Sequence, residues 1–230
     1  PYTAPAPVAY PPTVTTQPTG GSYDIGGTVT PLKVATSDTG AKYQWQQSTD
    51  GTNWTNIEGA TNPTYTPSAD ASGSTKYRCI ITGNNGLSTT SDAVTITVSK
   101  RYAVGARFTK SPLTFQVIKQ PAAKTTSALK NGTVRVVKPV KETYKSITVP
   151  TSVKMNGYTY NVTTIGKKAF YKNSKLKTVT IKSTKITSIG SKAFKGCKKA
   201  MTIKVPKSKY KAYKKLLKGK VPAGTKIKKI

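Results

Sequence analysis

Lysine side chains dominate the chemistry that this chain could perform. Of its 38 lysines and arginines, four lie in residues 1–99 and the other 34 in residues 100–230. The first segment also holds six of the seven acidic residues, so its net charge is −2, whereas the second holds only Glu142 and has a net charge of +33. Clustered charge of one sign attracts molecules of the opposite sign. The pattern predicts two modules, of which the second attracts polyanions.

The type of basic residue indicates how the second module would bind. Its only arginines are Arg101, Arg107 and Arg135. Arginine pairs bidentately with phosphates and guanines, whereas lysine is a hydrated point charge on a flexible stem. The composition favours diffuse attraction over specific recognition of nucleic acid, and a solvated surface that keeps the protein soluble is an equal alternative. The candidate polyanion contacts are lysines near the C-terminus: Lys198, Lys199, Lys207, Lys209, Lys211, Lys214 and Lys215.

Residues for catalysis or metal binding are scarce. The chain has no histidine, the commonest general base and metal ligand. Its two cysteines, Cys79 and Cys197, lie in different halves, so we expect two buried free thiols rather than a disulfide or a zinc site. Glycoside hydrolysis needs two carboxylates in one cleft, and the second module has one. A serine–lysine pair stays open, but no motif supports it. The sequence predicts no enzymatic activity, no cofactor and no metal.

A repeat shows how the second module is built. The motif IGKKAF at Ile165–Phe170 returns as IGSKAF at Ile189–Phe194, shifted by 24 residues. At the same shift, Val179 and Ile181 fall on Ile203 and Val205. A fixed period of this size predicts stacked structural units. We expect the repeats to fill residues 162–205, each with a single helical turn at IGxxAF and then a short strand, with the two phenylalanines stacked.

These motifs resemble the BspA-type leucine-rich repeats of bacterial surface proteins, whose pattern is roughly V-x-x-IG-x-x-AF-x-x-C-x-x-L-x-x-V-x-I. Cys197 stands at that family's frequent cysteine position, and Asn173 replaces it in the first repeat. The resemblance covers about residues 105–220, with a degenerate repeat strand at Ile147–Val149. It implies adhesion or display at a cell surface rather than catalysis.

The first module reads as a β-sandwich, because seven or so short strand-like runs alternate with turns such as Asp50-Gly51. Trp45 in a YQWQ strand and the segment Tyr77-Arg78-Cys79 resemble bacterial immunoglobulin-like domains over residues 21–99. The resemblance implies that Trp45, Tyr77 and Cys79 are core residues, with Tyr77 forming a tyrosine corner. The family's first cysteine is absent here, since Leu32 or Val34 occupies its strand, so hydrophobic packing must hold the sheets together.

One aromatic residue of this module has two interpretations. Trp54 follows the Asp50-Gly51 turn. It could be an exposed platform for a sugar, but packing on the face of the sheet is the favoured interpretation.

We therefore expect a mainly β protein. The sequence predicts a proline- and threonine-rich linker at 1–21, an immunoglobulin-like sandwich at 22–99 and a short leucine-rich-repeat solenoid at 100–230. Within the solenoid, residues 100–161 would form a β-rich cap, and residues 206–230 a C-terminal cap. Tyr210, Tyr213, Leu216 and Leu217 have the spacing of one helix face, so a capping helix is predicted there.

The resemblances and the charge lead to one main hypothesis and two alternatives. The main hypothesis is a secreted or cell-surface, non-enzymatic binding protein whose basic repeats hold an anionic cell-wall polymer, or a host matrix protein or glycan. No apolar run approaches the length of a membrane span. A nucleic-acid-binding protein is the first alternative, motivated by charge alone. A structural display module without a ligand is the second.

Overall fold

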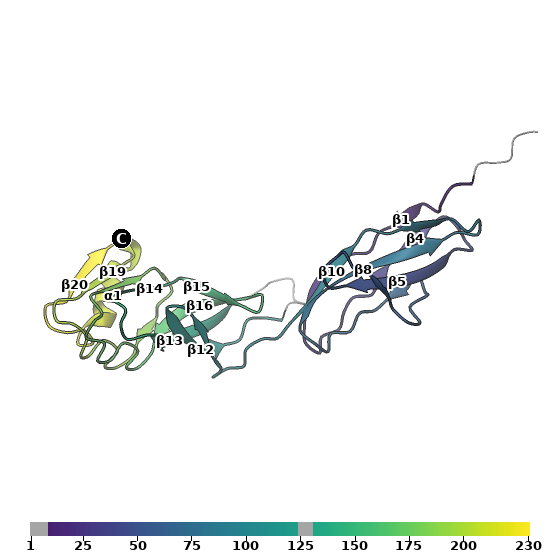
Figure 1. Ribbon diagram of the computed structural model, residues 1–230. Helices are drawn as coiled ribbons and strands as arrows, with labels where there is room; N and C mark the ends of the chain where they lie inside the picture. Colours follow the sequence, from purple (N-terminus) through teal and green to yellow (C-terminus); the bar gives the residue numbers. More distant parts are fainter. Residues whose placement is uncertain (1–8, 124–130) are drawn as a thin grey trace, which may run out of the picture. The chain divides into compact units, whose positions relative to one another are not determined.

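The computed structural model describes residues 9–123 and 131–230, which form two compact units (Figure 1). The first unit runs to Lys100 and includes Ala123, and the second comprises Arg101–Ala122 and the rest of the described chain. The regular elements of both are strands, apart from one 3-10 turn and one short helix in the second unit. The expected mainly β protein is confirmed.

The first unit contains one large sheet and two small ones. The large sheet has the order β2-β10-β8-β5-β6, with β9 also pairing with β8, while β1 pairs with β4 and β3 with β7. The strands are β1 (Val14–Thr16), β2 (Gly21–Asp24), β3 (Leu32–Lys33), β4 (Ala35–Thr36), β5 (Lys42–Ser48), β6 (Thr55–Asn56), β7 (Thr64–Tyr65), β8 (Gly73–Thr82), β9 (Ser88–Thr90) and β10 (Val94–Ser99).

The core of this unit surrounds Trp45, which is fully buried and whose indole N–H donates to the carbonyl of Asn62 at 2.9 Å. The Trp45 ring lies 6.1 Å from that of Tyr65, which in turn lies 5.8 Å from that of Tyr77. Cys79 is opposite Trp45 in the β5–β8 pairing and is also buried. The predicted core positions are confirmed. The Tyr77 hydroxyl pairs with the Thr75 side chain, and among the described residues no backbone partner of this hydroxyl is seen, as a tyrosine corner would require.

Buried aliphatic side chains take the place of the missing disulfide partner. Leu32 in β3 and Val34 beside it are 0% and 1% exposed, and both belong to the same cluster as Cys79. Burial of large apolar side chains contributes about 1.5–3 kcal/mol each. Hydrophobic packing therefore joins the small β3–β7 sheet to the large one.

The prediction that residues 1–21 form a linker is wrong for the described part of that segment. Strand β1 pairs with β4, and β2 begins at Gly21 and runs parallel to β10. The Gln17 side chain accepts the backbone N–H of Asp92 at 2.9 Å, and the Asn85 side chain donates to the carbonyl of Tyr10 at 2.7 Å. Proline is tolerated in edge strands, so a proline-rich composition does not prevent this pairing. Residues 1–8 lie outside the described residues.

The second unit opens with a mixed sheet of the order β11-β12-β13-β16-β15, with β18 also pairing with β16. Its strands are β11 (Arg107–Lys110), β12 (Leu113–Lys119), β13 (Gly132–Pro139), β15 (Ser152–Met155), β16 (Tyr158–Ile165) and β18 (Ser188–Ile189). The Asn156-Gly157 turn joins β15 to β16, and both residues have the positive φ, 49° and 73°, that such a two-residue turn requires.

A second sheet of this unit consists of four parallel strands: β14 (Ser146–Val149), β17 (Thr178–Ile181), β19 (Thr202–Val205) and β20 (Lys226–Lys229). Ile147, Val179, Ile203 and Ile227 are register partners across the sheet. The 24-residue step therefore continues one strand beyond the expected array, from Ile203 to Ile227. The segments 100–161 and 206–230 were predicted to form caps only. Each also contributes one strand to the repeat sheet, β14 and β20 respectively.

The expected helical turn at IGxxAF is wrong. Lys168 and Lys192 have φ of 57°, which a right-handed helix does not allow. The backbone N–H of Lys168 donates to the carbonyl of Ser191, and that of Phe170 to the carbonyl of Ala193. The motif makes hydrogen bonds between neighbouring repeats, so its turns follow one another along the stack.

The glycine of each motif permits this close stacking. A Cβ at Gly166 would lie 2.7 Å from the carbonyl oxygen of Val136, and one at Gly190 would collide with the backbone of Lys167. Real Cβ atoms essentially never come this close, so a side chain at Gly166 would push the first repeat away from β13, and one at Gly190 would push the two repeats apart. The IG dipeptide is thus a consequence of packing.

The predicted helix is present, and it lies in the chain between the last two strands of the array. The 3-10 turn η1 (Lys207–Lys209) leads into α1 (Tyr210–Leu217), which contacts β18 and β20 (Figure 1). Tyr213 and Leu217 are buried, whereas the lysines of the helix are exposed. The helix thus covers the apolar interior of the last repeat with its two buried side chains.

Candidate functional site

The seven predicted contact lysines are all exposed, but the structure does not bring them together as one cluster. Lys198 and Lys199 lie in the turn before β19, whereas Lys207 and Lys209 lie in η1 after it. A strand advances about 3.3 Å per residue, so the four residues of β19 separate the two pairs by more than 10 Å. The remaining three, Lys211, Lys214 and Lys215, belong to α1.

Lys211, Lys214 and Lys215 border a groove at the end of the array. Together with Lys218 they surround an apolar floor, and the groove has a volume of about 560 Å³. The floor is made by Leu217, Val221 and Ile227. Lys218 was not among the predicted contacts, although its helical spacing from Lys211, Lys214 and Lys215 would have placed it on the same face. We call these four residues the helix lysines.

A second set of lysines lies along the turns of the repeats. Lys168 and Lys192 occupy equivalent positions 24 residues apart, and so do Lys175 and Lys199. Because the turns are hydrogen-bonded to each other, equivalent backbone positions lie about 4.8 Å apart. All of these lysines are exposed. We call the set the turn-edge lysines: Lys168, Lys172, Lys175, Lys192, Lys195, Lys198 and Lys199.

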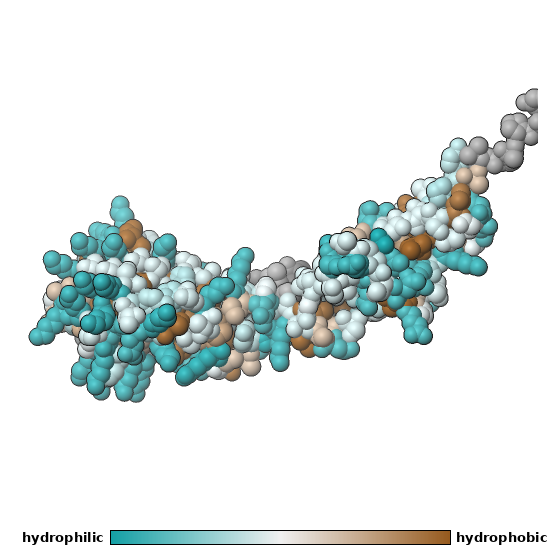
Figure 2. Space-filling view, viewed as in Figure 1, coloured by the Kyte–Doolittle hydropathy of each residue, from teal (hydrophilic) through white to brown (hydrophobic). Residues whose placement is uncertain are grey.

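Sequence reasoning named only Lys198 and Lys199 of this set. The 24-residue period was the signal that could have found the matched pairs, because it superimposes Lys168 on Lys192 and Lys175 on Lys199. Figure 2 shows long hydrophilic side chains gathered over the part of the second unit that holds α1, β19 and β20.

Acidic side chains do not neutralise this surface. Glu142 is the sole acid in residues 101–230, so the 88 residues that follow it contain none. The ammonium groups of Lys168 and Lys172 lie 5.4 and 5.6 Å from the centre of the Tyr171 ring, within the range of a cation–π interaction. Such contacts orient the lysines without removing their charge, so the turn edge stays strongly positive.

The two thiols are buried and unpaired, as expected. Burial raises the pKa of Cys79 and of Cys197 to about 11 from an ordinary value of 9.0. The Cys197 thiol donates to the carbonyl of Phe170 at 2.9 Å. A thiol held neutral in this way is a poor nucleophile and a poor metal ligand, so both cysteines are structural.

Their reactivity gives a first prediction. At pH 8 the folded protein is expected to react very slowly with a disulfide reagent such as DTNB, whereas protein unfolded in urea releases two equivalents at once. Because folding raises both thiol pKa values, the neutral thiols contribute to stability below pH 9 and lose that contribution as the pH rises to 11. Fast reaction of the native protein at pH 8 would contradict this assignment.

Trp54 packs on the sheet, which was the favoured interpretation. The Arg78 guanidinium lies 4.2 Å from the centre of its ring, and the indole N–H donates to the carbonyl of Gly51 at 3.2 Å. One face of the ring is therefore covered by a side chain of β8.

Within residues 9–123 and 131–230, no helix is long and apolar enough to cross a membrane. In the same part of the chain, no three histidine, cysteine, aspartate or glutamate side chains come together as metal ligands would.

Comparison with protein families supports the repeat assignment. Residues 142–220 match the model described as "BspA type Leucine rich repeat region (6 copies)". The predicted BspA-type repeats are thereby confirmed for this segment. Residues 17–100 match a model described as "Domain of unknown function (DUF8696)", which assigns neither a fold nor a role to the first unit.

Solved structures show weaker likeness. A leucine rich cell surface protein of Faecalibacterium prausnitzii matches 54% of this chain and 26% of its own length, with 23% identity and a TM-score of 0.32. A quinonprotein alcohol dehydrogenase-like protein of Bacteroides thetaiotaomicron matches 47% of this chain and 25% of its own, with 16% identity and a TM-score of 0.33. The match thus spans about a quarter of either protein, and at these TM-scores neither likeness bears on function. No curated protein matches the chain.

Proposed function

We propose that this protein is a non-enzymatic, secreted or cell-surface binding protein whose repeat unit holds anionic polymers along its turn edge. The observation that carries the proposal is the register of the turn-edge lysines. Lys168 and Lys192, and Lys175 and Lys199, recur at equivalent positions of stacked turns in a segment without acids beyond Glu142. The BspA-type family match supports an interaction module over the same residues.

A polymer suits this surface better than a small anion. Exposed ion pairs contribute only about 0.2–1 kcal/mol each, so one lysine would hold a single phosphate weakly. A chain of repeated anionic groups can contact several turns at once, and each further contact forms at a high effective concentration. Diffuse attraction of this kind weakens as salt screens the charges.

The two units would then have different roles. The first unit, with Trp45 in its core and a net charge of −2 over residues 1–99, is proposed as an immunoglobulin-like sandwich that acts as a spacer or a contact domain. The second unit is proposed as a short leucine-rich-repeat solenoid with a β-rich N-terminal cap. A non-enzymatic role agrees with thiols that burial keeps neutral and with a repeat unit that has one carboxylate side chain.

An anionic cell-wall polymer is the proposed partner, and a host matrix protein or glycan with anionic groups is the alternative. Nucleic acid fits less well, because the second unit offers lysines where bidentate reading of phosphates and bases favours arginine.

The test compares two variants of the full chain with equal net charge. In the first, Lys168, Lys175, Lys192 and Lys199 are changed to glutamine, and in the second the four helix lysines are. Binding to immobilised poly(glycerol phosphate) is measured across a range of sodium chloride concentrations. We expect affinity to fall steeply with salt. Each exposed charge contact contributes at least about 0.2 kcal/mol to binding. Loss of four such contacts should therefore make the turn-edge variant bind at least about fourfold more weakly than the unmodified protein.

The helix-lysine variant is the matched control and should bind nearly as well as the unmodified protein. Equal losses in both variants would refute the turn edge as the site. Absence of binding at low salt would favour the structural module without a ligand. Tighter binding of a DNA duplex than of poly(glycerol phosphate) at physiological salt would favour the nucleic-acid alternative.

A further inference from the structure

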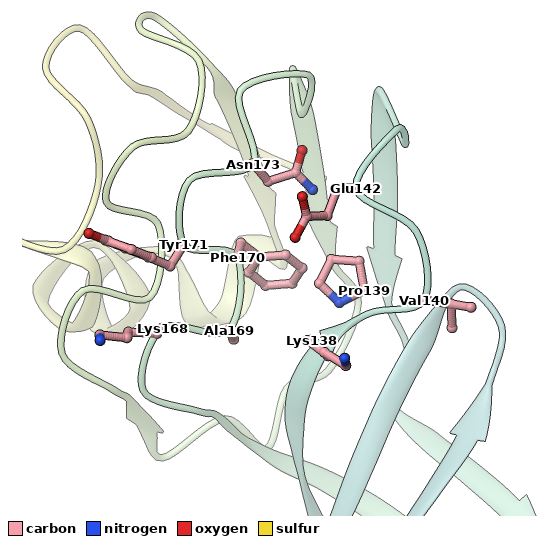
Figure 3. A pocket seen from close by; sticks show the side chains of 9 residues that line it. All are labelled: Lys138, Pro139, Val140, Glu142, Lys168, Ala169, Phe170, Tyr171 and Asn173. Carbon is pink, nitrogen blue, oxygen red and sulfur yellow. The ribbon is translucent and has the colours of Figure 1, made fainter.

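A cavity of about 270 Å³ opens at the N-terminal end of the stacked turns (Figure 3). Pro139 and Glu142, on the segment that leaves β13, line one side, and Phe170, Tyr171 and Asn173 of the first repeat turn line the other. The share of liquid water per molecule is about 30 Å³, so the cavity can accept more than a single water. Its volume lies close to the lower limit of small-molecule sites in proteins.

Asn173 is the unusual residue of this cavity. Its side chain is 3% exposed, yet within the described part of the chain neither the nitrogen nor the oxygen of its amide has a hydrogen-bond partner. Buried amides are almost always paired, because an unmade hydrogen bond costs free energy. An unpaired amide that lines a cavity indicates a ligand that completes it.

The repeat explains why this amide is unpaired. Cys197 is the equivalent residue 24 positions later, and its thiol donates to the carbonyl of Phe170 in the preceding turn. Asn173 points in the same way toward the turn that would precede its own. Among the described residues no such turn is hydrogen-bonded to it, because the segment between β13 and β14 makes backbone hydrogen bonds with Pro112 and Lys177 instead. The amide therefore faces the cavity instead of a backbone carbonyl.

The chemistry of the unpaired groups selects the ligand. An amide needs an acceptor for its N–H and a donor for its oxygen, and a hydroxyl group can serve as both. A phosphodiester has no proton to donate to the amide oxygen, and a metal ion has no acceptor for the N–H. Glu142, an exposed side chain that lines the same cavity, can accept a hydrogen bond from a further hydroxyl.

We propose that this cavity binds a sugar through vicinal hydroxyl groups. Asn173 would pair with two neighbouring hydroxyls, Glu142 with a third, and the C–H face of the ring would lie against Phe170 and Pro139. The contacts involve no charge on the ligand, so this binding should be insensitive to salt, unlike the proposed attraction of anionic polymers, although Lys168 of the turn edge also lines the cavity.

The test follows the side-chain amide signal of Asn173 by NMR in the uniformly ¹⁵N-labelled full chain. Glucose, galactose and N-acetylglucosamine are titrated separately. We expect at least one of them to shift this signal in a saturable manner, and equally at low salt and at 0.5 M sodium chloride. At 0.5 M, about fivefold above the salt concentration at which the Debye length is ~10 Å, attraction between exposed charges is strongly screened. The Asn173→Cys variant restores the residue of the following repeat and should weaken the binding seen by other cavity signals at least tenfold.

Two further variants sharpen the result. Glu142→Gln keeps the shape of the side chain and should weaken binding several-fold, while Thr148→Ala in β14 is a control that should bind normally. A ¹⁵N spectrum that keeps its dispersion verifies that each variant is folded. The proposal is overturned if no sugar shifts the Asn173 signal, in which case ordered water completes the amide. It is also overturned if trialanine or sodium phosphate shifts the signal as strongly as the sugars do.

Discussion

Replacing Phe194 by alanine is expected to destabilise the second unit by about 3–5 kcal/mol. The side chain is fully buried, and its ring is stacked on that of Phe170 with centres 5.1 Å apart and planes 13° from parallel. Truncation removes the burial of one ring and leaves the face of the other against a cavity. The neighbouring turns are hydrogen-bonded to each other, so they cannot easily close that cavity.

Urea unfolding of the full chain measures this loss. Both tryptophans, Trp45 and Trp54, belong to the first unit, so their fluorescence follows that unit, while circular dichroism contains the transition of the second. We expect the Phe194→Ala change to lower the midpoint of the second transition. Phe194→Leu keeps most of the apolar volume and should cost less than about 1.5 kcal/mol. Similar losses for alanine and leucine would show that the stacked ring is not a principal contact.

The repeats show which parts of the fold a sequence pattern can predict. The 24-residue shift correctly placed Val179 beside Ile203, because strand register repeats with the pattern of buried residues. The same pattern could not distinguish a helical turn from the observed turns at Ile165–Phe170. Both conformations bury the alanine and the phenylalanine, and they differ in the hydrogen bonds between repeats, which a single repeat does not reveal.

The last strand escaped prediction because its sequence is atypical. Strand β20 reads KIKK and has one apolar residue, Ile227, which is half-buried because the strand lies at the edge of its sheet. An edge strand with lysines is a common defence against pairing with other chains. Only the position of Ile227, 24 residues after Ile203, indicated that the array continues.

The candidate sites were predictable in residue type but not in arrangement. Charge segregation correctly indicated exposed lysines, yet proximity in sequence grouped Lys199 with Lys207, which β19 separates. The exchange of cysteine for Asn173 was visible in the repeat. The unpaired state of the Asn173 amide could not be predicted, because it depends on the absence, among the described residues, of a hydrogen-bonded turn before the first repeat.

Replacing Tyr213 by phenylalanine is expected to cost at least about 2 kcal/mol in the second unit. The hydroxyl is buried, donates to the carbonyl of Ser183 at 2.8 Å and accepts the N–H of Ile186 at 2.9 Å. Both partners lie in the segment that joins β17 to β18, so one side chain fastens the capping helix to the repeat array. The change keeps the ring but leaves a buried donor and a buried acceptor unpaired, at about 1–3 kcal/mol each.

Tyr210→Phe is the matched control, because the Tyr210 hydroxyl is half-buried and reaches the carbonyl of Ile227 only at 3.5 Å. That variant should lose less than about 0.5 kcal/mol, as most exposed substitutions do. Hydrogen exchange locates the effect, since Tyr213→Phe should reduce the protection of the Ile186 amide specifically. Unchanged protection at Ile186, or equal losses of stability in the two variants, would mean that α1 is held by the burial of Tyr213 and Leu217 alone. The capping helix would then be attached by apolar contact, without the directional bonds that fix its position over the last repeat.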